Sequence, residues 1–248
     1  MCTVVFAWQV FADAPVVVAA NRDESLDRAS EPPAVVGEEP RIVAPLDVGA
    51  GGTWIGYNGD SVFAALTNRW TGRDVTGDRS RGLLVRDALA EPTAEAACRL
   101  VERELEERTY EGFNLVCADE RAALYVEYDG SVSVRTVRPG VHVVVNVGAD
   151  GEYVVPGERR DAGERQAENA DALATALAPE PGETARDWLD RAADAISDHE
   201  YGVCVHGDGY GTRSSSLVAV RTDGTTYRYA DGPPCETAYE RVDVSVME

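Results

Sequence analysis

The chain has 248 residues, of which 44% are hydrophobic and 27% charged, the composition of a folded globular protein long enough to bury a full core. Its 44 acidic residues outweigh 23 basic ones to give a net charge of −21, and every basic residue is arginine. Such a surface repels nucleic acid and anionic lipid. No apolar run approaches the roughly 20 residues of a membrane span, and no secretory signal is expected. We expect a cytoplasmic protein, without a nucleic-acid partner, whose acidic, lysine-free composition is typical of salt-in halophiles.

The first part of the chain predicts strands followed by two helices. Apolar runs predict two strand pairs, Thr3–Gln9 with Val16–Ala20 and Thr53–Tyr57 with Ser61–Thr67. Asn58-Gly59-Asp60 is a strong hairpin signal between the members of the second pair. Residues 25–52 are rich in Pro, Glu and Gly and predict a long irregular connection. Apolar residues at helical spacing then predict helices over Ser80–Ala90 and Thr93–Arg108.

The second part repeats this order of strands and then helices. Four strands are expected at Phe113–Ala118, Ala123–Tyr128, Ser131–Val137 and Val141–Val147. Two helices are expected over Glu158–Leu177 and Thr184–Ser197, the latter with a capping box formed by Thr184 and Asp187. The predicted closing strands are Gly202–Val205, Ser214–Arg221, Thr225–Ala230 and Arg241–Val244.

Hairpin-connected strands alternate with paired helices, a grouping that favours antiparallel sheets covered by helices over a doubly wound parallel sheet. No Pro/Gly/Ser-rich linker divides the chain, so we expect one domain over residues 1–248. The fold class indicated is α+β.

Five cysteines are spaced widely without a C-x-x-C pair: Cys2, Cys98, Cys117, Cys204 and Cys235. This pattern predicts neither a disulfide framework nor a zinc knuckle, and it suits a reducing compartment. The three histidines, His142, His199 and His206, show no metal-binding spacing. We therefore expect no metal and no cofactor, and we interpret Cys98, Cys117 and Cys204 as core residues.

Cys2 directly follows the initiator methionine. Methionine aminopeptidase removes Met1 before a small residue, which would leave Cys2 with a free α-amine. An α-amine with a pKa of roughly 7.7–8.0 can accept the proton of the neighbouring thiol, so that one residue supplies both nucleophile and base. The alternative interpretation is that Cys2 is only the second residue of an edge strand.

Polar residues end the second predicted strand, where the hairpin returns beside residue 2. Asn21-Arg22-Asp23-Glu24 places an acid that can hold an α-ammonium next to an arginine that can lower a thiol pKa. A solvated turn is the alternative interpretation of this segment.

Taken together, motifs along the chain resemble the NRDE family, also called the transport and Golgi organisation family. The matching segments run in order from the N-terminus: Met1-Cys2-Thr3, residues 18–24, Arg28, residues 50–56, residues 65–68, Ser80-Arg81-Gly82, residues 112–115, Pro139-Gly140 and residues 210–215. Residues 147–200 match weakly, because Arg159-Arg160 stands where the family more usually shows a Trp-Pro-Lys motif.

The resemblance implies an N-terminal nucleophile hydrolase fold, a four-layer αββα sandwich shared with enzymes that cleave amides. Carried over, it implies that Cys2 is the nucleophile, Asp23 the acid that holds the amine and Asn146 the oxyanion donor, with Asn58 at the other wall of the site. Asn21, Trp54 and Asn68 are further expected near the substrate, although core packing is the alternative interpretation of Trp54.

One departure from those enzymes concerns the arginine of the second strand. They show Arg-x-x-Asp, whereas Arg22 and Asp23 are adjacent here, and neighbouring residues of a strand face opposite ways. Arg213, after a glycine-rich stretch, is the possible replacement cation, and an ordinary surface ion pair is the alternative interpretation of this residue.

Two functions are consistent with these residues. The first is an N-terminal-cysteine amidohydrolase that cleaves a non-peptide C–N amide bond of a small molecule. The second is a non-catalytic binding protein or carrier for an apolar metabolite, such as a lipid, acyl-CoA or haem, on the same fold. The substrate and the oligomeric state are not encoded in any motif.

Overall fold

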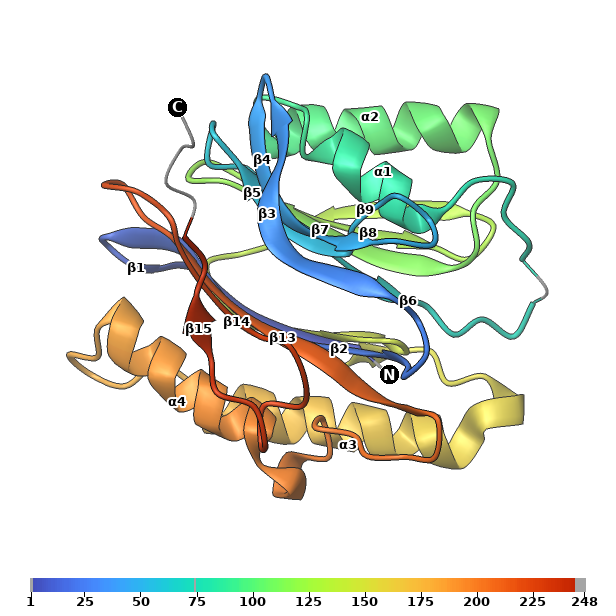
Figure 1. Ribbon diagram of the computed structural model, residues 1–248. Coiled ribbons are helices and arrows are strands. Elements are labelled where there is room, and N and C mark those ends of the chain that lie inside the picture. Colours follow the sequence, from blue (N-terminus) through green and yellow to red (C-terminus); the bar gives the residue numbers. More distant parts are fainter. Residues whose placement is uncertain (1, 74, 244–248) are drawn as a thin grey trace.

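The computed structural model describes residues 2–73 and 75–243. Two antiparallel sheets are stacked face to face, and a pair of helices covers the outer face of each sheet (Figure 1). This four-layer αββα sandwich confirms the expected α+β fold.

The larger sheet has eight strands in the order β12-β11-β10-β1-β2-β13-β14-β15. Their bounds are β1 Thr3–Phe11, β2 Ala14–Ser25, β10 Gly140–Val145, β11 Gly148–Ala149, β12 Glu152–Tyr153, β13 Tyr210–Val220, β14 Thr226–Ala230 and β15 Glu240–Arg241. The long central strands β1, β2 and β13 pair antiparallel, and they carry the first residues of the chain into the middle of the sheet.

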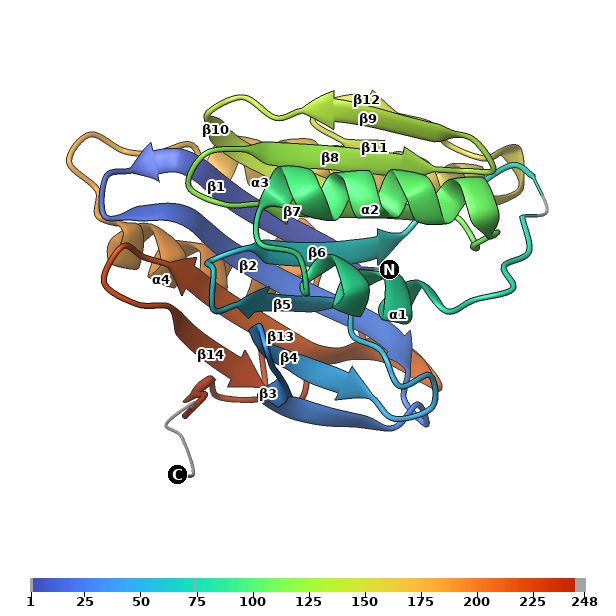
Figure 2. The same cartoon turned by 90° about the horizontal axis from the view of Figure 1, so that it is seen from above.

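The smaller sheet has seven strands in the order β3-β4-β5-β6-β7-β8-β9. Their bounds are β3 Ser30–Glu38, β4 Arg41–Asp47, β5 Ile55–Asn58, β6 Phe63–Asn68, β7 Phe113–Ala118, β8 Ala123–Tyr128 and β9 Val132–Thr136. Helices α1 (Arg81–Ala88) and α2 (Ala94–Glu107) lie over this sheet (Figure 2). Helices α3 (Arg160–Ala176) and α4 (Ala185–Ser197) cover the larger one. The 3₁₀ turns η1 (Gly157–Arg159) and η2 (His199–Tyr201) precede α3 and follow α4.

Alternation along the strands builds separate apolar layers. In β1, Val4 and Phe6 face the other sheet, whereas Val5 and Ala7 face α3 and α4. A third layer joins α1 and α2 to the outer face of the smaller sheet and contains Cys98 and Cys117, which are core residues as expected. No helix among the described residues is long and apolar enough to cross a membrane.

Three expectations about the elements need correction. The stretch 25–52 contains strands β3 and β4, and Pro32 and Pro33 lie in the edge strand β3 where its register with β4 shifts between Glu31 and Ala34. Residues 202–205 form no strand and instead connect η2 to β13. The last strand is only Glu240–Arg241, and position 244 of the expected strand lies outside the described residues.

Candidate functional site

A small cavity of about 90 Å³ opens between the two sheets beside Cys2. Its lining residues come from both sheets, from the loop between β4 and β5, and from the start of α1: Cys2, Arg22, Glu24, Arg28, Asp47, Thr53, Trp54, Leu66, Asn68, Ser80, Arg81 and Gly82. Cys2 and Arg22 belong to the larger sheet, and Leu66 and Asn68 belong to β6 of the smaller one.

The Cys2 thiol lies half-buried at this cavity, with its Sγ 3.6 Å from the backbone oxygen of Asp23. Burial raises the pKa of the Cys2 thiol, while the positive charge of Arg22 acts in the opposite direction. The buried thiol is therefore protonated near neutral pH and needs a base before it can act as a nucleophile.

The nitrogen of Cys2 is held by Asn146, which directly follows β10 and is almost completely buried. Cys2 N donates to Oδ1 of Asn146 over 3.1 Å, and Gln166 Nε2 donates to the same oxygen over 2.9 Å. Nδ2 of Asn146 donates to the Asn68 backbone oxygen over 2.6 Å. The Asn146 amide thus connects β1, β6 and α3 around the nitrogen that would become the α-amine.

The side chains of Arg22 and Asp23 point to opposite faces of the larger sheet, as the alternation of side chains along a strand requires. Cys2, Ala20 and Arg22 face the other sheet, because the register that pairs Thr3 with Asn21 places Cys2 beside Arg22. Arg22 therefore faces the cavity although Asp23 follows it immediately.

Arg22 is buried with only 5% of its side chain exposed. Its guanidinium carbon lies 4.1 Å from the centre of the Trp54 ring, and Nη2 lies 3.5 Å from Oδ2 of Asp47. Burial lowers the pKa of Arg22, and its Nη1 has no hydrogen-bond partner among the described residues. The second partner of Asp47 is Arg28, at 2.7 Å. Trp54, expected near the substrate, thus lines the cavity and holds Arg22.

Asp23 is fixed on the other face of β2 by β13. Thr212 Oγ1 donates to Asp23 Oδ1 over 2.6 Å, and Val205 N donates to the same hydroxyl over 2.8 Å. Burial raises the pKa of Asp23 to about 6, against the opposing effect of the hydrogen bond from Thr212. Asp23 is therefore largely ionised at neutral pH and becomes neutral in mildly acidic solution.

The loop between β4 and β5 is pressed onto the first turn of α1. A Cβ atom on Gly52 would lie 2.2 Å from the backbone carbon of Gly82, so only glycine permits this approach. Thr53 N donates to the Gly82 oxygen over 3.0 Å. Asp47 Oδ1 accepts from the backbone nitrogens of Gly49 and Ala50, which closes the loop. Gly51 has a positive φ of 69°, and Gly52 is needed for the contact with α1.

Three expected site residues have other places in the structure. Asn58 does not line the cavity, because its amide is used at the β5–β6 turn, donating to the Leu89 and Glu91 oxygens. The amide of Asn21 points to the helix layer and donates to the Ile196 and Val203 oxygens. Arg213 is the extra residue of a β-bulge in β13 and does not line the cavity, whereas Arg22 does, together with Arg28 and Arg81.

Several cavity residues have no role in the expectations drawn from the sequence, although some lie in the quoted motifs. Asp47 is the clearest, because nothing in the sequence separates it from the other acidic residues, yet it pairs with both Arg22 and Arg28. Asp47 ends β4 of the smaller sheet, so its contact with Arg22 of β2 depends on how the two sheets pack together.

Comparison with solved structures defines the class of fold. The penicillin V acylase of Agrobacterium tumefaciens matches over 93% of this chain and 83% of its own, with a TM-score of 0.59 and 16% identity. An N-acylethanolamine-hydrolyzing acid amidase orthologue from Caenorhabditis elegans matches over 90% and 98%, with a TM-score of 0.52 and 12% identity. A variant of the conjugated bile acid hydrolase of Clostridium perfringens matches over 98% and 92%, with a TM-score of 0.51 and 11% identity. The chain has the N-terminal nucleophile hydrolase fold.

Sequence comparison identifies the family. The profile of the family described as Transport and Golgi organisation 2 matches residues 1–231, and this chain belongs to that family. The human Transport and Golgi organization protein 2 homolog is 29% identical over 230 residues, covering 84% of this chain and 83% of the human protein. The mouse homolog is 27% identical over 234 residues with the same coverage.

Proposed function

We propose that this chain is an amide hydrolase whose nucleophile is the Cys2 thiol, freed as the N-terminal residue by removal of Met1. The observation that carries the proposal is the placement of Cys2: the residue lines the cavity, its nitrogen donates to Asn146, and its sulfur lies 3.6 Å from the backbone oxygen of Asp23. The solved neighbours that share the fold include acylases and amidases by name.

The proposed reaction uses two groups of Cys2, its α-amine and its thiol. The α-amine of Cys2 accepts the thiol proton, and the thiolate attacks the amide carbonyl carbon. The tetrahedral intermediate collapses to a thioester, and the departing amine takes the proton from the α-ammonium. Water, deprotonated by the same α-amine, then attacks the thioester, releasing the acid and restoring the thiol. Asp23 would hold the α-ammonium between these transfers.

Two donors are suited to the negative oxygen of the intermediate. Asn146 does not itself line the cavity but contacts Cys2, and its Nδ2 carries two N–H groups, of which the Asn68 oxygen accepts one. Arg22 lines the cavity, and its Nη1 has no acceptor among the described residues. A cation and an amide positioned before the reaction stabilise developing charge without reorganisation.

The charges of the cavity favour an amide that carries a carboxylate. Among the lining residues, three guanidiniums, those of Arg22, Arg28 and Arg81, outnumber two carboxylates, those of Glu24 and Asp47, and Arg81 also pairs at 2.8 Å with Glu111, which is not part of the lining. This arginine-rich lining contrasts with the net charge of −21. A small N-acyl amino acid therefore suits the site, whereas the charged lining and the volume of about 90 Å³ do not favour an apolar carrier function.

The test combines intact mass, thiol labelling and turnover. Purified protein should lack Met1, should be alkylated by iodoacetamide first at Cys2, and should hydrolyse N-acyl amino acids faster than their methyl esters. Cys2→Ala should abolish hydrolysis, while Cys98→Ala, a cysteine of the α2 layer, should retain it. Retained Met1 in all of the protein, or hydrolysis by Cys2→Ala, would contradict the proposal.

A further inference from the structure

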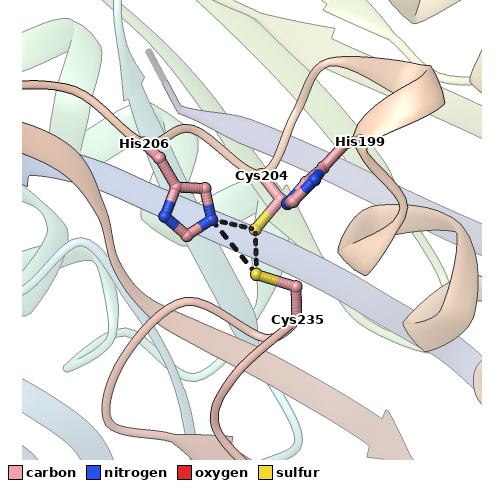
Figure 3. A group of neighbouring side chains, drawn as sticks. All are labelled: His199, Cys204, His206 and Cys235. Atoms are coloured by element: carbon pink, nitrogen blue, oxygen red, sulfur yellow. Dashed lines mark hydrogen bonds between the residues drawn. The ribbon is translucent and has the colours of Figure 1, made fainter.

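We infer that His199, Cys204, His206 and Cys235 form a metal site for Zn²⁺ (Figure 3). The inference is independent of the proposed hydrolysis, because none of these four residues lines the cavity at Cys2. It also replaces the expectation of no metal site, which rested on the spacing of cysteines and histidines along the chain.

The four side chains come from three separate segments. His199 lies in η2, Cys204 and His206 lie in the connection to β13, and Cys235 lies in a turn that follows β14. This turn is closed by backbone hydrogen bonds from Glu236 and Thr237 to the oxygen of Pro233. Folding thus brings together two thiols and two imidazoles that do not form a recognisable metal-binding motif in the sequence (Figure 3).

The separations of the ligand atoms suit a tetrahedral ion. Cys204 Sγ lies 3.5 Å from Cys235 Sγ and 3.7 Å from His206 Nε2, and His206 Nε2 lies 3.1 Å from Cys235 Sγ. All four ligand atoms lie within 4.8 Å of one another. Bonds of roughly 2.3 Å to sulfur and 2.0–2.1 Å to nitrogen at tetrahedral angles place ligand atoms about 3.4–3.8 Å apart. His199 is exposed, so its ring can turn to complete the set.

The chemistry of the donors and the charge of their surroundings select the ion. Two thiolates with two imidazoles form the Cys₂His₂ set of structural zinc sites, and a set without carboxylate does not favour Mg²⁺ or Ca²⁺. Four exposed acidic residues flank the ligands in the sequence: Asp198, Glu200, Asp208 and Glu236. Their charges favour the binding of a cation. Binding would release the two thiol protons to solvent.

The site would fasten the segment that supports Asp23. Cys204 and His206 flank Val205, whose nitrogen donates to Thr212 Oγ1 and whose oxygen accepts from Thr212 N, both over 2.8 Å. The bound ion would tie the Cys235 turn to this segment and hold Thr212 in register with β2. Its role is therefore structural, and its first consequence is stability.

The experiment is a titration of the full chain with ZnCl₂ after chelation and reduction. We expect one Zn²⁺ per chain by elemental analysis, and a rise in Tm of roughly 5–10 °C when free Zn²⁺ is 100-fold above Kd. With CoCl₂ as the probe, we expect the visible bands of tetrahedral cobalt and the near-ultraviolet thiolate charge-transfer bands.

Variants at exposed ligands test the assignment without disturbing the core. Cys235→Ser and His206→Ala should each weaken Zn²⁺ binding by more than about 100-fold while keeping the wild-type circular dichroism spectrum. His199→Ala should weaken binding as well. The matched control is His142→Gln, a partly buried histidine on β10, far from the four ligands in the sequence, that bonds Asp150 and the Arg138 oxygen, and it should bind like the wild type.

Three results would overturn the inference. The reduced protein could show no change in Tm and retain no metal. His199→Ala could bind as tightly as the wild type, which would remove the four-ligand site. Finally, the protein purified under reducing conditions could contain a Cys204–Cys235 disulfide, seen as the loss of two hydrogens in mass, which would assign these thiols to a covalent bond instead.

Discussion

Thr212 donates a 2.6 Å hydrogen bond from its hydroxyl to Oδ1 of Asp23, which joins β13 to β2 directly beside Cys2. This bond favours the ionised carboxylate and so opposes the effect of burial on the pKa of Asp23. The hydroxyl also accepts from Val205 N, so one side chain fixes both the acid and the chain segment behind it.

Replacing this hydroxyl should raise the pKa of Asp23. In Thr212→Val, Asp23 loses a donor, so the titration of its carboxyl group, followed by NMR, should shift to higher pH by up to about one unit. The free energy of unfolding should fall by about 1–3 kcal/mol, because Val205 N loses its acceptor. Thr212→Ser, which keeps the hydroxyl, should resemble the wild type in both measurements, and an unchanged titration in Thr212→Val would contradict the role given to this bond.

The pKa of Asp23 also predicts how stability depends on pH. Its folded pKa of about 6 exceeds the ordinary value of 3.8, so the folded state binds this proton more tightly than the unfolded state does. The resulting stabilisation is fully present below pH 3.8 and is lost as the pH rises through about 6. Asp23→Asn removes this dependence. Between pH 5 and pH 7 the variant should gain about 1 kcal/mol of unfolding free energy relative to the wild type.

Urea unfolding of the wild type and of Asp23→Asn at pH 5 and pH 7 measures this change in unfolding free energy, and both pH values lie above the isoelectric point of about 4.5. If the difference in unfolding free energy between the two proteins is the same at both pH values, Asp23 has an ordinary pKa. The same substitution should also abolish hydrolysis, since a neutral amide cannot balance the charge of an α-ammonium, so stability and activity should change in opposite directions.

Arg22 should control how readily the Cys2 thiol ionises. Its charge lowers the pKa of Cys2, so Arg22→Gln should raise that pKa and slow iodoacetamide alkylation by about tenfold at neutral pH. Arg28→Gln is the matched control, because Arg28 also pairs with Asp47 but stands farther along the chain from Cys2. Equal slowing in both variants would mean that the effect comes from the Asp47 ion pairs and not from the position of Arg22.

The contact between Gly52 and Gly82 predicts a steric effect on stability. In Gly52→Ala the new methyl group would meet backbone atoms of Gly82 and Leu83, which have no flexible end to move aside. We expect a loss of about 1–3 kcal/mol and a fall in Tm of roughly 2–10 °C by calorimetry. Gly72→Ala, at a glycine with open space around it, should leave Tm within about 1 °C. Similar Tm values for the two variants would refute the close approach.

Most strands and helices could be predicted from the sequence, because their apolar residues recur at the spacing of a strand or a helix and turn residues separate them. The hairpin of β1 and β2 and the capping box of Thr184 and Asp187 agree with the structure. Strand β3 was missed because Pro32 and Pro33 are read locally as breakers, whereas their tolerance depends on the strand being at an edge, which only the assembled sheet determines.

The direction of a side chain was predictable where local geometry decides it. Alternation along β2 requires Arg22 and Asp23 to diverge, and they do. Asn58 was misplaced because a hairpin asparagine can serve either a turn or a ligand, and its neighbours Leu89 and Glu91, over thirty residues away, decide for the turn. The grouping of Cys204 with Cys235 was beyond reach for the same reason, since it depends on contacts between distant segments.

The two sheets contribute differently to the cavity. Arg22 stands on β2 of the larger sheet and Cys2 directly precedes β1, whereas Trp54, Leu66 and Asn68 reach the cavity from the smaller sheet and the loop that leads into it. The proposed nucleophile and much of the surface that a substrate would touch are thus carried by separate layers of the sandwich. Within the proposed function, substitutions in the smaller sheet that spare Trp54, Asp47 and Asn68, the partners of Arg22 and Asn146, can alter which molecule is accepted while the nucleophile stays in place, so that specificity can diversify within one architecture.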